Sequence, residues 1–161
     1  MLCLFITASC APVLKGPLDS DRPEAAVRTL DHGYGLLVAV LQPESSATLI
    51  FGVKHASKGT EALVRRISNA AANGLRAVQD LQVLAPPIKT TAQGLPLIEV
   101  SVRNHIMNTQ AATLLLAGES FETEFLVTQQ KACNYISALA STLAKADSNE
   151  KRSAVLNSLA A

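Results

Sequence analysis

Residues 60–84 of this 161-residue chain, TEALVRRISNAAANGLRAVQDLQVL, have the clearest secondary-structure pattern in the sequence. Its apolar residues recur every three or four positions, at Leu63, Ile67, Ala71, Leu75, Val78 and Leu81. Its polar residues fall on another face, at Arg65, Asn69, Asn73, Arg76 and Asp80. Such a pattern is typical of an amphipathic α-helix. We expect the helix to end where two prolines follow Ala85, because a residue before proline disfavours the helical conformation.

Similar patterns on either side of this stretch predict further helices at 23 to about 41, 96–117, 121–146 and from 147 to the C-terminus. Start signals support them: Asp21 with Pro23 and Glu24 before the first helix, Ser120 before the fourth, and a capping-box pattern at 147–150 before the last. The inner face of the third helix is expected at Ile98, Val102, Ile106 and Leu115. That of the fourth is expected at Phe121, Phe125, Ala132, Ile136, Leu139 and Leu143, and that of the last at Val155, Leu156 and Leu159.

Residues 36–53 carry the main ambiguity of the sequence. Two short apolar runs, 36–41 and 47–53, surround the turn-like PESS at 43–46, and this arrangement also suits a β-hairpin. We favour helix for the first run because it continues a segment with a good helix start. The second run, TLIFGV, fits a strand and a short helix equally well.

Composition agrees with a helical protein of one domain. Apolar residues make up 48% of the chain and are dominated by alanine, leucine and valine, which excludes a disordered chain and favours helix. We predict an all-α fold, an antiparallel four- or five-helix bundle at 23–161, with an α+β fold carrying a hairpin near 36–53 as the alternative. Residues 14–22, LKGPLDSDR, are predicted to be a linker.

The N-terminal stretch MLCLFITASCAPV, residues 1–13, is uncharged and apolar. It is too short to span a bilayer as a helix, but its length matches the apolar region of a secretory signal. Ala8, Ser9 and Cys10 after this run resemble the lipidation site of a bacterial lipoprotein signal, although Thr7 stands where a larger aliphatic residue is usual. The resemblance implies a signal peptide, lipid on Cys10 as the only membrane contact, and a place in the bacterial cell envelope or periplasm. The alternative is a cytoplasmic protein in which this stretch is part of the fold.

Basic residues gather in the second helical segment. Lys58, Arg65, Arg66 and Arg76 form a candidate anion-binding face for phosphate or anionic lipid. A solvated helix face explains the same residues, and no aromatic side chains interleave with them as single-strand binders require. The formal net charge of +1 also argues against nucleic acid as a partner.

Motifs for catalysis or metal binding are absent from the sequence. A di-metal carboxylate bundle requires E-x-x-H motifs, and the chain contains none. Cys133 lies in the middle of a predicted helix, away from the features that activate a thiol, so we interpret it as structural. We therefore predict no catalytic residue, no metal ligand and no cofactor.

Polar amides on the third and fourth predicted helices are expected to make interhelical hydrogen bonds that fix the register. The alternative is that they line a small polar pocket. They are Asn104, Asn108 and Gln110, and Gln129, Gln130 and Asn134.

The function predicted from these features is non-enzymatic: a helical structural or interaction domain with a protein partner. One alternative is a metal-binding or enzymatic bundle with a site built from scattered residues, such as His32, Glu99, His105 and Glu122. Another is a cytoplasmic partner-binding or nucleic-acid-associated module that uses the basic second segment.

Overall fold

The computed structural model describes residues 23–161, which form five α-helices and two 3-10 helices. They are α1 (Pro23–Glu44), η1 (Ala47–Gly52), α2 (Lys58–Asp80), η2 (Leu81–Val83), α3 (Leu97–Leu116), α4 (Phe121–Ala146) and α5 (Glu150–Ala160). No strand occurs in this part of the chain, which confirms the all-α helical bundle and shows that the hairpin alternative near 36–53 is wrong. The predicted leader at 1–13 with Cys10, and the linker at 14–22 with Asp21, lie outside the described residues.

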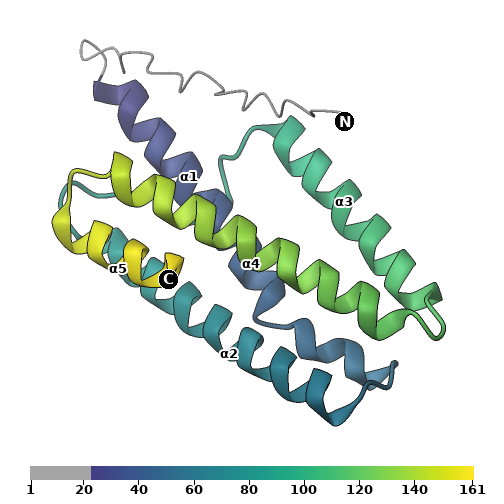
Figure 1. The fold of residues 1–161 in the computed structure, drawn as a ribbon. Helices are drawn as coiled ribbons and strands as arrows, with labels where there is room; N and C mark the ends of the chain where they lie inside the picture. The colour runs from purple at the N-terminus through teal and green to yellow at the C-terminus, as the bar shows by residue number, and fades with distance from the viewer. Residues whose placement is uncertain (1–22) are drawn as a thin grey trace, which may run out of the picture.

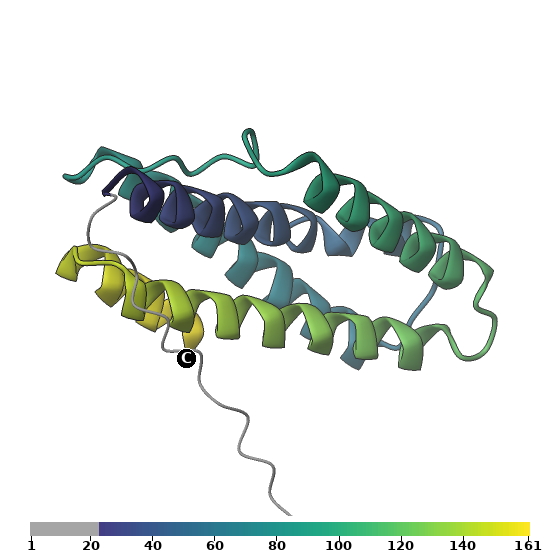
Figure 2. The ribbon, with the colours of Figure 1, turned by 90° about the horizontal axis from the view of Figure 1, so that it is seen from above.

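α4 packs most extensively against α5 and α1, and it also contacts α2 and α3 (Figure 1). α1, α3 and α5 run opposite to α4, whereas α2 runs in the same direction as α4. α3 is joined to α4 by a short turn and lies beside the bundle rather than within it (Figures 1 and 2). Short connections between helices explain this largely antiparallel arrangement.

Two hydrophobic clusters lie along the bundle. The main core joins α1, α2, α4 and α5, with residues such as Tyr34, Leu37, Leu41, Val78, Ile136 and Leu156 buried. The phenylalanine cluster lies nearer the α3–α4 turn and contains Val64, Leu114, Phe121 and Phe125. Its rings are in contact: Phe121 stacks on Phe125 with 5.5 Å between centroids, and Phe51 of η1 meets Phe125 edge-on at 5.7 Å. Burial of Ile50 and Phe51 against this cluster decides the conformation of residues 47–53, which the sequence left open.

α1 extends to Glu44 and contains Pro43 in its last turn, beyond the end predicted near Leu41. Proline has no N–H, so it leaves the carbonyl four residues earlier, that of Ala39, without its helical partner. The Arg103 side chain of α3 donates to this carbonyl over 2.6 Å. The hydrogen bond compensates for the proline and also attaches α3 to α1.

The buried face of α2 agrees with the predicted one in part. Ala71, Val78 and Leu81 are buried as predicted, whereas Leu63 is 41% exposed. Polar and small residues complete the buried face of the helix, at Thr60, Ser68 and Gly74. Small residues let α2 approach its neighbours closely: a methyl group added at Gly74 would lie 2.7 Å from the Leu159 side chain. A pattern based on hydrophobicity ranks Leu63 above Ser68 and Gly74 and therefore misplaces this part of the face.

Two predicted helix caps are also corrected. Ser120 makes no capping hydrogen bond, and its hydroxyl donates instead to Glu124. At the start of α5 the cap is Asn149, whose side chain accepts from the backbone N–H of Arg152 over 3.0 Å. Asp147 is buried and takes part in the ionic network described below.

Gly35 of α1 allows a loop to cross the helix. A Cβ atom at this position would lie 2.7 Å from the backbone oxygen of Thr91. Glycine has a low helix propensity, so its presence in the middle of α1 is explained by this close approach of the loop.

The segment Ala25–Gly52 is long and apolar enough to cross a membrane by length and composition alone. Within it, α1 buries Tyr34, Leu37 and Leu41 in the main core. The core helix of a globular protein can have this length and composition, although only 28% of the apolar window in this segment is buried.

Candidate functional site

A groove of about 390 Å³ runs between α1, α3 and α4 and is the strongest candidate for a binding site. We call it the α3 groove. Its apolar lining includes Val40 of α1, Val102 and Ile106 of α3, and Ala132 and Tyr135 of α4. The volume falls in the range of sites that accept drug-sized ligands or side chains.

The α3 groove exists because α3 turns its apolar stripe away from the core. Ile98, Val102 and Ile106 were predicted to face inward, but they are 74%, 46% and 48% exposed. Leu115, also predicted to face inward, is 51% exposed, and Leu114 is the buried residue of α3. The hydrogen bond from Arg103 to α1 fixes the rotation of α3 and points a polar side chain, rather than the stripe, toward the bundle.

Charged residues line the same groove. Glu44 comes from α1, Glu99 and Arg103 come from α3, and Lys131 comes from α4. Burial raises the pKa of Glu44, and the neighbouring Gln129 side chain offsets part of that rise. Of the two carboxylate oxygens of Glu44, Oε2 is buried and has no hydrogen-bond partner among the described residues.

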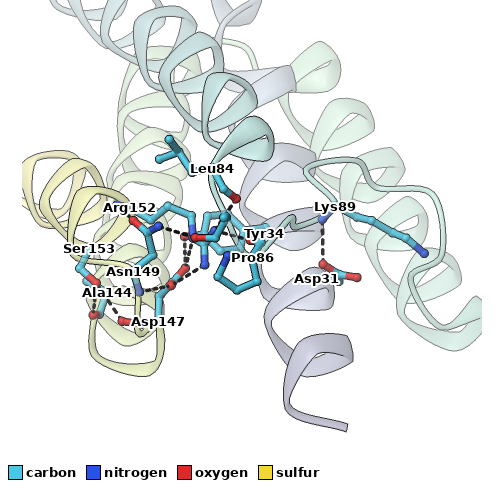
Figure 3. Close-up of polar contacts among 11 residues, drawn as sticks. Asp31, Tyr34, Leu84, Pro86, Lys89, Ala144, Asp147, Asn149, Arg152 and Ser153 are labelled. Atoms are coloured by element: carbon cyan, nitrogen blue, oxygen red, sulfur yellow. Dashed lines mark hydrogen bonds and ion pairs between the residues drawn. The ribbon is translucent and has the colours of Figure 1, made fainter. Parts of the chain in front are cut away.

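A second polar cluster closes the opposite end of the bundle, where α1, α4 and α5 meet the loop after η2 (Figure 3). Arg152 is fully buried and donates to both carboxylate oxygens of Asp147, from Nε over 2.6 Å and from Nη2 over 2.9 Å. Its Nη1 donates to the carbonyls of Leu84 and Pro86. The Tyr34 hydroxyl donates to Asp147 over 2.7 Å. Every polar atom faces a protein partner, so this network stabilises the chain crossing and is not a ligand site.

The pKa values in this network follow from the same contacts. Burial raises the pKa of Asp147, but hydrogen bonds from Arg152, the backbone N–H of Asn149 and Tyr34 outweigh burial and hold the pKa below its usual range. Burial and the bond to Asp147 raise the pKa of Tyr34. The network therefore contains an ionised aspartate and a protonated tyrosine at neutral pH.

Glu122 joins the first turns of α2 and α4. Its carboxylate accepts from the backbone N–H and hydroxyl of Ser57, over 2.6 and 2.9 Å, and from the Thr60 hydroxyl over 2.7 Å. These hydrogen bonds lower the pKa of Glu122. The Glu122 side chain of α4 therefore caps the start of α2, and its carboxylate is engaged in these hydrogen bonds.

The four residues of the candidate anion-binding face lie on α2 and are all exposed. Lys58 and Arg76 are eighteen positions apart, about 27 Å along a helix, so the four do not form one compact patch. Arg65 lies 4.0 Å from Glu61, and Arg76 donates to Asn73 over 2.6 Å. Anion binding by this face stays a prediction.

Other residues singled out in the sequence are spread over the bundle. Within residues 23–161 no three histidine, cysteine or acidic side chains come close enough to hold a metal ion, and this holds for His32, Glu99 and His105. Cys133 is exposed, and partial burial with the charge of Glu44 raises the pKa of its thiol. A raised pKa disfavours the reactive thiolate.

The predicted interhelical hydrogen bonds between amides of α3 and α4 do not occur. Gln129 is buried, and its Oε1 atom has no partner among the described residues. The sequence did not predict that Gln129 of α4 lies next to Glu44 of α1. Nothing in the sequence indicates that a residue after Pro43 still belongs to α1. The buried ion pair of Asp147 and Arg152 was not predicted either, because the pattern at 147–152 is typical of a solvent-exposed helix start.

No known protein-family model matches this chain, and no solved structure matches it. The function must therefore be inferred from the residues of the chain itself.

Proposed function

We propose that this protein is a non-enzymatic interaction domain that binds an amphipathic helix of a partner protein in the α3 groove. The observation that carries the proposal is the outward apolar stripe of α3, whose residues Val102 and Ile106 line the groove wall. Docking of an amphipathic helix through apolar residues spaced three or four apart is a common mode of peptide recognition. A third helix laid against α3 and α4 would cover the stripe.

The lining of the groove supports binding of a helix rather than of a small polar substrate. Its floor and walls are mostly apolar, and Met107, which tolerates partners of varied shape, contributes to them. Tyr135 is 45% exposed beside Val102 and offers a large side chain with a polar tip. Tyrosine is enriched at protein interfaces for this reason.

The attachment of α3 also supports the proposal. α3 buries little side-chain surface, with Leu114 as its one buried residue, and it is held mainly by the Arg103 hydrogen bond and the turn to α4. A weakly packed helix has a low local free energy of opening and can adjust to a partner.

Photo-cross-linking in the native host tests the proposal. A benzophenone amino acid is placed at Ile106 in the groove and, as a control, at Leu49 of η1, which is 77% exposed. We expect an adduct from position 106 that is lost when Val102 is replaced by Glu. The cross-linked peptide should have apolar residues at helical spacing. Equal adducts from both positions, adducts to segments without that spacing, or adducts to a second copy of this chain would contradict helix docking.

A place at the bacterial cell envelope is a second part of the proposal, and it rests on the Ala8-Ser9-Cys10 pattern. The test is the intact mass of the protein expressed from its own start codon in a bacterial host, with membrane and soluble fractions separated. Loss of residues 1–9 and a lipid mass on Cys10 are expected in the membrane fraction. A soluble species of full length would contradict lipidation.

A further inference from the structure

Three polar side chains form a layer between the two hydrophobic clusters. Glu44 of α1, Ser68 of α2 and Gln129 of α4 stand where the main core ends and the phenylalanine cluster begins. Along the chain each lies between residues packed in one cluster and in the other: Leu41 and Ala47, Ala71 and Val64, and Ile136 and Phe125, respectively. Since α1, α2 and α4 pack on one another, the three side chains lie at one level of the bundle.

One oxygen atom of each side chain in this polar layer lacks a hydrogen-bond donor. Glu44 Oε2, Ser68 Oγ and Gln129 Oε1 are buried and make no hydrogen bond in the described part of the chain. Ser68 is 4% exposed and Gln129 is 3% exposed, so bulk water does not serve them. Buried polar atoms in proteins are nearly always paired, and three unpaired oxygens at one level indicate a site that receives donors from outside.

Glu44 connects the layer to the α3 groove. Its side chain lines the groove and also lies next to the side chain of Gln129. No lysine or arginine nitrogen of the described chain comes within 4.0 Å of its carboxylate. Arg103 is committed to the carbonyl of Ala39, and Lys131 on the groove wall is exposed. The groove therefore presents a carboxylate without a counter-charge next to apolar walls.

We propose that the polar layer binds the charged head of a lysine or arginine side chain that the docked helix inserts into the α3 groove. The alkyl stem lies along the apolar wall near Val40 and Ala132, as such stems do on apolar surfaces. The head donates to Glu44, the member of the polar layer that lines the groove. This inference rests on the proposed function and names the chemistry of the partner: an apolar helix face with one basic residue at its centre.

Two small probes test the charge preference on the full-length protein: 3-phenylpropylammonium, which mimics a basic side chain with an apolar body, and the neutral 3-phenylpropan-1-ol. Binding is followed by amide chemical shifts at neutral pH. We expect both probes to shift residues of the α3 groove and the ammonium to bind about tenfold more tightly or better, as a hydrogen bond to a charged group provides.

Glu44→Gln is expected to reduce that preference to less than about twofold, with the affinity for the alcohol unchanged. Glu99→Gln is the matched control, since Glu99 lines the same groove, and it should keep the preference. A preference that survives Glu44→Gln, or that Glu99→Gln removes equally, overturns the inference and leaves the groove as a neutral docking site. If neither probe shifts groove residues, the groove itself, and with it the proposed function, is contradicted.

Discussion

Replacing Asp147 by Asn is the sharpest test of the forces that hold the bundle end together. The wild-type carboxylate accepts four hydrogen bonds: two from Arg152, one from Tyr34 and one from the backbone N–H of Asn149. Asparagine keeps one oxygen but places an NH₂ group where an acceptor is needed. A donor then faces a donor, and the Arg152 charge stays fully buried without a counter-charge.

The expected loss of unfolding free energy is about 3–5 kcal/mol, the cost of removing one partner from a buried ion pair. One lost hydrogen bond to a charged group contributes about 1.5–3 kcal/mol of it, and the uncompensated charge contributes the rest. The carbonyls of Leu84 and Pro86, which Arg152 retains, keep the loss from being larger. The free energy of unfolding of a typical domain is only about 5–15 kcal/mol, so the variant is expected to be marginally stable.

Urea unfolding followed by circular dichroism measures the loss. Glu61→Gln is the matched control, because its pair with Arg65 spans 4.0 Å and the two side chains are 35% and 62% exposed. An exposed pair of this kind contributes at most about 1 kcal/mol. A loss below about 1 kcal/mol for Asp147→Asn would refute the reasoning, since it would mean that the buried charge is not desolvated as the structure shows.

The same network predicts a dependence on pH. The folded-state pKa of Asp147 is lowered, so its contribution to stability is complete above the pKa of about 3.9 of an unfolded aspartate. The contribution is lost as the pH falls from that value through the folded-state pKa. We expect the difference in unfolding free energy between wild type and Asp147→Asn to narrow over this acid range. A difference that stays constant down to pH 2 would contradict the assignment.

Three further changes have defined outcomes. Glu44→Gln is expected to raise the unfolding free energy at pH 8 by about 1 kcal/mol. The change replaces a buried carboxylate, one oxygen of which has no hydrogen-bond donor, with an uncharged amide that can itself donate. Burial raises the folded-state pKa of Glu44, so the unfolding free energy of the wild type should fall as the pH rises from the ordinary glutamate range through that pKa. Urea unfolding at pH 4 and pH 8 should therefore show Glu44→Gln to be more stable than the wild type at pH 8 only. Arg103→Met should lower the unfolding free energy by about 1–3 kcal/mol, because it leaves the partly buried carbonyl of Ala39 without a donor. Part of this loss should be recovered when Pro43→Ala is added, because alanine restores the helical N–H. A double-mutant cycle without coupling between the two sites would contradict that pairing. Gly35→Ala should lower the unfolding free energy by about 1–3 kcal/mol, because the new Cβ would press on the carbonyl oxygen of Thr91. Gly59→Ala is the control and should not lower it, since the space around Gly59 is open. Thermal unfolding measures both variants. Equal effects at the two glycines would argue for helix propensity as the cause.

The five α-helices could be predicted from the sequence, because hydrophobic periodicity and helix-breaking residues are properties of one segment. The periodicity of residues 60–84 and 121–146 predicted α2 and α4, and the predicted span of α4 agrees with its observed bounds. The buried side chains Phe121, Phe125 and Leu143 were predicted as well, since large apolar residues in a good helix have few other places to go.

The face that a helix buries could not be predicted where polar or small residues compete with apolar ones, because it depends on the neighbouring helices. α3 turns Val102 outward because Arg103 is required at the carbonyl that Pro43 leaves unpaired, and no pattern within residues 97–116 records a proline on another helix. The polar layer at Glu44 and Gln129 arises in the same way, from helices that meet at one level although they are distant in sequence. Hydrophobic periodicity measures the preference of each segment alone, whereas desolvation and hydrogen-bond pairing depend on what the other helices place opposite it.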